Sequence, residues 1–178
     1  MNLLTDREFF LLLHLGLGII FIHGFAGGIA TLVDRTSLRL QGTPLQARIR
    51  AVSTSFMAFA LWAAVVSGTW LVYPGYGEEP PDGAATTAYP RADLQANGDL
   101  AFWHDFGMEW KEHVAWLTPF LATAVAFAAI RHGRRVSRDT AIRRSLVRLF
   151  TVAAAASVVA AGLGAVINKV APNQFLDL

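Results

Sequence analysis

Cysteine is absent from this chain of 178 residues, and charged residues are scarce. Without cysteine the chain has no disulfides, thiolate metal sites, iron–sulfur clusters or covalent haem attachment through a Cys-x-x-Cys-His motif. Charged residues make up only 16% of the chain, whereas 54% of its residues are hydrophobic. A soluble domain of this length cannot bury so much apolar surface, so the composition predicts a protein that lies in a membrane.

The sequence also lacks the motifs that mark common enzymes. It contains no phosphate-binding glycine loop, no dinucleotide fingerprint and no nucleophile with a recognisable paired base. Independent enzymatic activity therefore has little support in the sequence.

Four apolar stretches are each long enough to cross the hydrocarbon as an α-helix at about 1.5 Å per residue. They show no sustained two-residue alternation and are rich in alanine, leucine and phenylalanine, which disfavours strands. We therefore predict one all-α domain over residues 1–178, an integral membrane four-helix bundle in up-down-up-down order. The predicted helices cover residues 9–33, 51–73, 106–130 and 149–170.

The distribution of charge predicts the orientation of this bundle. Eleven of the fifteen basic residues lie in the connections 34–50 and 131–148, and cytoplasmic loops of membrane proteins carry such an excess. Most acids lie outside these two connections. We therefore expect both connections in the cytoplasm and both termini outside, in a plasma membrane of the bacterial type.

The connection 74–101 is expected on the outer side, and its turn signals favour a folded cap or a docking surface. The helix 149–170 carries many small residues, which let helices approach closely. These two segments are the predicted contacts with other membrane subunits. Lipid is the other expected partner, and nucleic acid is not expected, because topology already explains the arginines.

Two histidines at similar depth suggest a cofactor. His14 lies eight residues after Asp6, and His113 lies eight residues after Asp105. If the helices are parallel, both imidazoles lie roughly 10 Å below the outer boundary, as the two axial ligands of a haem b require. Gly18, one turn after His14, would leave space for a flat macrocycle.

At the level of pattern, this pair resembles the family of membrane b-type cytochromes whose haem lies inside a four-helix bundle. The resemblance covers the helix count and one histidine pair, and it implies a haem b and a role in electron transfer. The two-haem members carry paired histidines on one helix face, whereas His14 and His23 are nine residues apart and lie on opposite faces. His23 could be a single axial ligand, face a partner subunit or bond a helix carbonyl.

The segment from Asp105 to His113 allows other chemistry. Asp105, Glu109, Glu112 and His113 form one broad stripe that we expect to face inward, so Glu109 and Glu112 with His14 and His113 could bind a divalent metal or relay protons. Alternatively, Lys111 reaches the membrane surface and pairs with one of these glutamates.

The leading functional hypothesis is a small haem-b-binding membrane subunit of a respiratory or photosynthetic electron-transfer complex. The alternative is a non-catalytic accessory subunit without a haem that packs against a larger complex and binds lipid or pigment. A metal-binding or proton-translocating membrane protein is the third possibility.

Overall fold

The computed structural model describes residues 6–33 and 42–171, and these residues form helices and turns with no strand among them. Within this part of the chain, four helical segments are long and apolar enough to cross a membrane, which confirms the prediction of an all-α protein with four such helices. The four segments are Phe9–Val33, Pro44–Tyr76, Trp103–His132 and Thr140–Val170.

Two of the four long segments contain a short π-helical turn, η1 in the second segment and η3 in the third. The 3₁₀ turn η2 lies in the connection between these two segments. In chain order the elements are α1 (Asp6–Val33), α2 (Pro44–Ser67), η1 (Gly68–Val72), α3 (Tyr73–Tyr76), η2 (Thr86–Ala88), α4 (Pro90–Ala96), η3 (Trp103–Met108), α5 (Glu109–His132), α6 (Arg135–Arg138) and α7 (Thr140–Val170).

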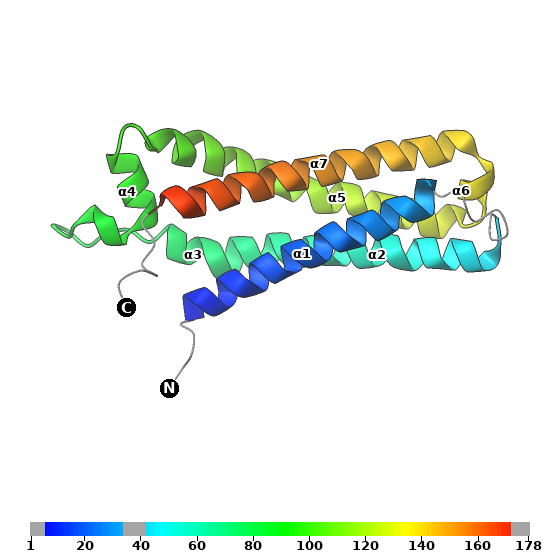
Figure 1. The fold of residues 1–178 in the computed structure, drawn as a ribbon, viewed down its shortest axis with the longest axis horizontal. Helices are drawn as coiled ribbons and strands as arrows, with labels where there is room; N and C mark the ends of the chain where they lie inside the picture. Colours follow the sequence, from blue (N-terminus) through cyan, green and yellow to red (C-terminus); the bar gives the residue numbers. More distant parts are fainter. Residues whose placement is uncertain (1–5, 34–41, 172–178) are drawn as a thin grey trace.

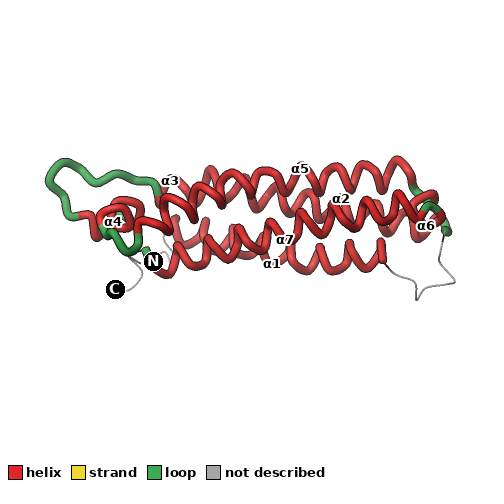
Figure 2. Tube along the Cα trace, turned by 90° about the horizontal axis from the view of Figure 1, so that it is seen from above, coloured by secondary structure: helices red, strands yellow, loops and turns green. Residues whose placement is uncertain are grey.

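The long helices lie side by side along the long axis of the molecule (Figure 1). α1 and α5 begin at the end that carries α4, and α2 and α7 return to that end (Figures 1 and 2). We call it the cap end, and we call the opposite end, where α6 lies, the arginine end. Contacts join α1 to α2, α2 to α5, α5 to α7 and, less extensively, α7 to α1. α1 is therefore diagonal to α5 in the bundle.

Two helices begin earlier than the apolar stretches in the sequence. α2 begins at Pro44, where the Thr43 side chain accepts a hydrogen bond from the Gln46 N–H. α7 begins at Thr140, where Asp139 accepts from two backbone N–H groups. These first turns are polar, so hydropathy marks only the apolar part of each helix. Residues 34–41 of the first predicted basic connection lie outside the described residues.

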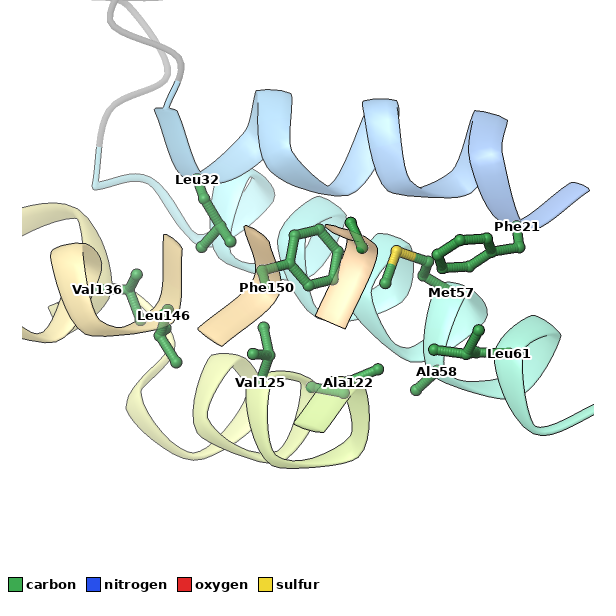
Figure 3. Close-up of a cluster of buried hydrophobic side chains, with 12 residues drawn as sticks. Phe21, Leu32, Met57, Ala58, Leu61, Ala122, Val125, Val136, Leu146 and Phe150 are labelled. Carbon is green, nitrogen blue, oxygen red and sulfur yellow. The ribbon is translucent and has the colours of Figure 1, made fainter. Parts of the chain in front are cut away.

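The core of the bundle lies towards the arginine end (Figure 3). Phe150 is fully buried, and its ring lies 4.9 Å from that of Phe25, centroid to centroid. A β-carbon placed on Gly28 would lie only 2.7 Å from the Phe150 ring. The face of α1 that carries Phe25 and Gly28 therefore packs against the protein's own side chains. The cluster contains Phe21, Leu32, Met57, Ala58, Leu61, Ala122, Val125, Ala126, Val136, Leu146, Phe150 and Ala154.

A second apolar cluster closes the cap end, where α4 lies across the bundle (Figure 1). Leu94 of α4 is fully buried in this cluster. Beside it, the Tyr76 hydroxyl and His104 Nδ1 form a buried hydrogen bond of 2.8 Å. The segment between the second and third long helices therefore folds as a cap over the bundle. The cluster contains Tyr76, Leu94, Met108, Ile167 and Ala171.

Pro119 lies inside α5, where it has no N–H to donate to the carbonyl of Ala115. The Thr118 hydroxyl donates to that carbonyl instead, over 2.7 Å. In hydrocarbon no water can take this role, so the local side chain supplies the missing donor.

We expect Thr118→Val to lower the free energy of unfolding by about 1 kcal/mol, because it leaves the Ala115 carbonyl unsatisfied without changing the side-chain volume. Unfolding of the purified protein in mixed micelles, followed by circular dichroism, measures the change. Thr151→Val, at an exposed position on α7, is the matched control. Equal stability of the two variants would contradict this account of Pro119.

Candidate functional site

The His14 side chain points into the bundle, towards α2. Its Nδ1 lies 3.1 Å from the Ser67 hydroxyl oxygen. That hydroxyl donates its single proton to the carbonyl of Ala64, over 3.0 Å, so the His14 Nδ1–H donates to Ser67. The neutral ring then carries a free lone pair on Nε2. Gly68 permits this contact, because a β-carbon there would lie 2.8 Å from the imidazole.

The His113 side chain points away from the bundle. It is 78% exposed, and its Nδ1–H donates to the carbonyl of Glu109 over 2.7 Å. The Glu109 carboxylate is 62% exposed and lies 3.9 Å from the same nitrogen. With Nδ1 occupied, Nε2 is the free nitrogen of His113 as well.

The structure does not bring His14 and His113 together. They lie on diagonal helices, and one ring faces inward while the other faces outward. A haem held between these two rings inside one chain does not fit this arrangement. Sequence spacing predicted a similar depth for the two histidines. The direction of each side chain depends on the rotation of its helix, and the predicted inward stripe on α5 was wrong about that rotation.

The other two residues expected near a cofactor lie on α1. His23 is exposed, and its Nδ1–H donates to the carbonyl of Ile19 over 2.9 Å. A β-carbon placed on Gly18 would meet no atom within 4 Å, so this glycine borders open space. His14 is half-buried while His23 faces outward, in agreement with their predicted opposite directions.

The residues of the alternative metal site are also separated. Glu109 and His113 face outward, His14 faces inward, and the buried Glu112 Oε1 has no hydrogen-bond partner among the described residues. In residues 6–33 and 42–171, no three histidine, aspartate or glutamate side chains lie close enough to hold a metal ion.

A shallow hollow lies on the outward face of α5 and η3, and His113 forms part of its wall. Phe106 and Trp110 give it aromatic surface, and the Phe106 ring stacks on that of Phe102 at 5.2 Å. The carboxylates of Asp105 and Glu109, expected to face inward, line this exposed hollow instead. Here carboxylates, aromatic rings and a histidine nitrogen meet on the surface of a helix that could span a membrane. We call this surface the His113 face.

Two further polar side chains bear on His14. Ser67 was not singled out by the sequence, and Lys111 was named there only in the alternative in which it extends to the membrane surface. The stem of Lys111 instead packs against Gly164 of α7, because a β-carbon placed on Gly164 would lie 3.3 Å from Lys111 Cε. Lys111 also interacts electrostatically with His14. The helical period of α5 is the signal that indicates the direction of Lys111. Residues two apart on a helix point in nearly opposite directions, and Lys111 lies two residues before the outward-facing His113.

The fold and these sites define a class of protein, an all-helical chain with four helices able to cross a membrane and polar groups on both the inner and the outer helix faces. Comparison with protein-family models, with curated proteins and with solved structures finds no match.

Proposed function

We propose that this chain is a membrane subunit of a respiratory or photosynthetic electron-transfer complex, and that His113 supplies one axial ligand to a haem b held between α5 and a partner subunit. The observation that carries the proposal is the geometry of His113. Its Nδ1–H is held by the carbonyl of Glu109, so Nε2 is free on the outward face.

Histidines that bind metals nearly always donate their second ring N–H to a carbonyl or a carboxylate. His113 donates to the carbonyl of Glu109 and has the Glu109 carboxylate 3.9 Å away. Both groups fix the ring and increase the basicity of Nε2 towards a metal. Phe106 and Trp110 in the wall of the hollow offer the apolar contact that a porphyrin needs.

The need for a partner follows from the position of these groups. Glu109 and His113 lie on the outside of a helix able to span a membrane, and ionisable groups that face lipid are costly. A partner helix that covers the His113 face would remove this cost. It would also supply the second axial ligand of a six-coordinate haem.

The alternative function, an accessory subunit without a haem, uses the same surface. In that case a partner helix with a basic or hydroxyl side chain pairs with Glu109 directly, and no cofactor lies between them. The exposed carboxylate supports this candidate as well as the first. Haem content separates the two functions.

The test compares His113→Ala with His23→Ala in the complex isolated from its native membrane. Both histidines are outward-facing and donate Nδ1–H to the carbonyl four residues earlier, but His23 is not in the wall of the hollow. We expect His113→Ala to lower haem b per chain at least tenfold and His23→Ala to leave it unchanged. Haem b absent from the wild-type complex, or retained fully by His113→Ala, would contradict the haem proposal.

We also propose that the bundle crosses the plasma membrane in up-down-up-down order with the cap end outside. The arginine-rich turns at the opposite end support this orientation. Because the chain has no cysteine, single cysteines can report it directly.

In intact cells of a bacterial host, we expect Ala84→Cys in the cap to react with a membrane-impermeant maleimide. Thr140→Cys at the arginine end should react only after lysis; both positions are exposed. The reverse pattern would overturn the orientation, and labelling of both cysteines in intact cells would overturn the four crossings.

A further inference from the structure

Two arginines share one face of α7 in its first turns, at the arginine end of the bundle (Figure 1). Arg144 and Arg148 are four residues apart in continuous α-helix, so their β-carbons lie about 5 to 6 Å apart. Both side chains are exposed. Two like charges at this spacing destabilise a helix. The preference of arginine for cytoplasmic ends of helices accounts for arginines at this end, but not for two of them on one face.

No carboxylate offsets these two charges in the described part of the chain. α7 contains no acidic residue. Within residues 6–33 and 42–171, the guanidinium groups of Arg144 and Arg148 make no ion pair and no hydrogen bond. Asp139, the nearest acid in the sequence, uses its Oδ1 to cap the first turn of α7. The pair is therefore open to an anion that approaches from outside the bundle.

The same face continues towards the cap end as an apolar surface. At helical spacing after Arg148 it carries Val152, Ala155 and Val159, all of them exposed, with Val152 at 55% and Val159 at 46%. From Arg148 to Val159 this surface is about 16 Å long at 1.5 Å per residue. One leaflet of hydrocarbon is about 15 Å thick, so the apolar surface has the length of an acyl chain. We call these five residues, from Arg144 to Val159, the α7 face.

We propose that the α7 face binds an anionic phospholipid, whose phosphate lies between Arg144 and Arg148 and whose acyl chain lies along the apolar surface. Guanidinium groups donate paired hydrogen bonds to phosphate oxygens, and an anion between the two arginines removes their repulsion. A zwitterionic lipid fits less well, because its ammonium group brings a third positive charge to the pair. This site is separate from the His113 face and does not depend on a haem there.

The test titrates the full-length protein, purified in a mild detergent, with dioleoyl phosphatidylglycerol or dioleoyl phosphatidylcholine and counts bound lipids by native mass spectrometry. We expect phosphatidylglycerol to bind at least tenfold more tightly than phosphatidylcholine, because the hydrogen bonds join opposite charges without a competing ammonium. Glycerophosphoglycerol, the same headgroup without acyl chains, should bind at least tenfold more weakly than the lipid, because it cannot contact the apolar surface. The headgroup comparison separates a lipid from a free phosphate ester.

Two double variants then assign the site. Arg144→Gln with Arg148→Gln removes the charge of the pair, and we expect it to weaken phosphatidylglycerol binding at least tenfold while phosphatidylcholine binding stays unchanged. Arg134→Gln with Arg135→Gln removes the same charge from exposed positions at the same end, but adjacent residues do not share a helix face. This control should bind as the wild type does. Circular dichroism confirms that each variant folds.

Three results would overturn the proposal. Equal binding of the two lipids by the wild type, or unchanged binding by the folded Arg144 and Arg148 variant, would leave an acidic partner subunit as the occupant of the pair. Equal losses in both double variants would assign binding to the overall charge of this end. Glycerophosphoglycerol binding as tightly as the lipid would make a free phosphate ester the ligand. His113→Ala should bind phosphatidylglycerol as the wild type does, so this outcome is independent of the haem proposal.

Discussion

Replacing Arg50 with alanine is expected to lower the free energy of unfolding by about 3 kcal/mol. Arg50 is 2% exposed at the arginine end. Its Nε donates to the carbonyl of Thr31 and its two terminal nitrogens to the Gly133 carbonyl and the Ser137 hydroxyl, over 2.9 to 3.3 Å. One side chain thus joins α1, α2 and the turn after α5. Its loss removes the Arg50 donor from the Thr31 and Gly133 carbonyls and from the Ser137 hydroxyl, which keeps only its bond to Gln46, and it leaves a void between them.

The measurement is unfolding of the purified protein in mixed micelles by increasing mole fraction of sodium dodecyl sulfate. Arg48→Ala removes the same side chain from an exposed position on the same helix and is expected to change stability by less than about 0.5 kcal/mol. Arg50→Lys should recover only part of the loss, since an ammonium cannot reach three divergent acceptors as a guanidinium does. Equal effects of Arg50→Ala and Arg48→Ala would contradict the role given to Arg50.

Replacing Gly28 with valine is expected to cost about 3 kcal/mol, because the new β-carbon would lie 2.7 Å from the fully buried Phe150 ring. Neither helix can accommodate it without moving α1 away from α7. The close approach of α1 to the core depends on the absence of a side chain at this position.

Gly27 provides the control, since a β-carbon there would meet nothing within 4 Å. Gly27→Ala should leave stability unchanged or raise it by up to about 1 kcal/mol, because alanine favours the helix. The same unfolding measurement applies. The double variant Gly28→Val, Phe150→Leu should regain part of the stability lost in Gly28→Val. Equal stability of Gly28→Val and Gly27→Ala would contradict the close packing of Gly28 against the Phe150 ring.

Hydropathy predicted four helices because the apolar stretches are long and uninterrupted. It did not predict that α2 and α7 extend into arginine-bearing turns. Those turns depend on the helix caps at Thr43 and Asp139. They also depend on contacts that Arg50 makes with residues more than eighty positions away in the sequence. Local hydropathy carries no information about such contacts.

The candidate sites were predicted less completely than the fold. Depth along a helix follows from counting residues, which gave His14 and His113 similar levels. Direction depends on how each helix is rotated in the bundle, and all-round apolar helices give little signal for that rotation. On α5, His113 faces outward and Lys111 faces inward, which is the opposite of the predicted direction of the stripe. Ser67 was not predicted as a site residue, because a serine in an apolar helix usually bonds its own backbone.

The central claim, that His113 Nε2 is a haem ligand, is tested most directly by chemical rescue. The complex carrying His113→Gly should lack the reduced α-band of haem b and regain it when haem and free imidazole are added, because imidazole occupies the place of the missing side chain. A full α-band in His113→Gly without imidazole would contradict the claim.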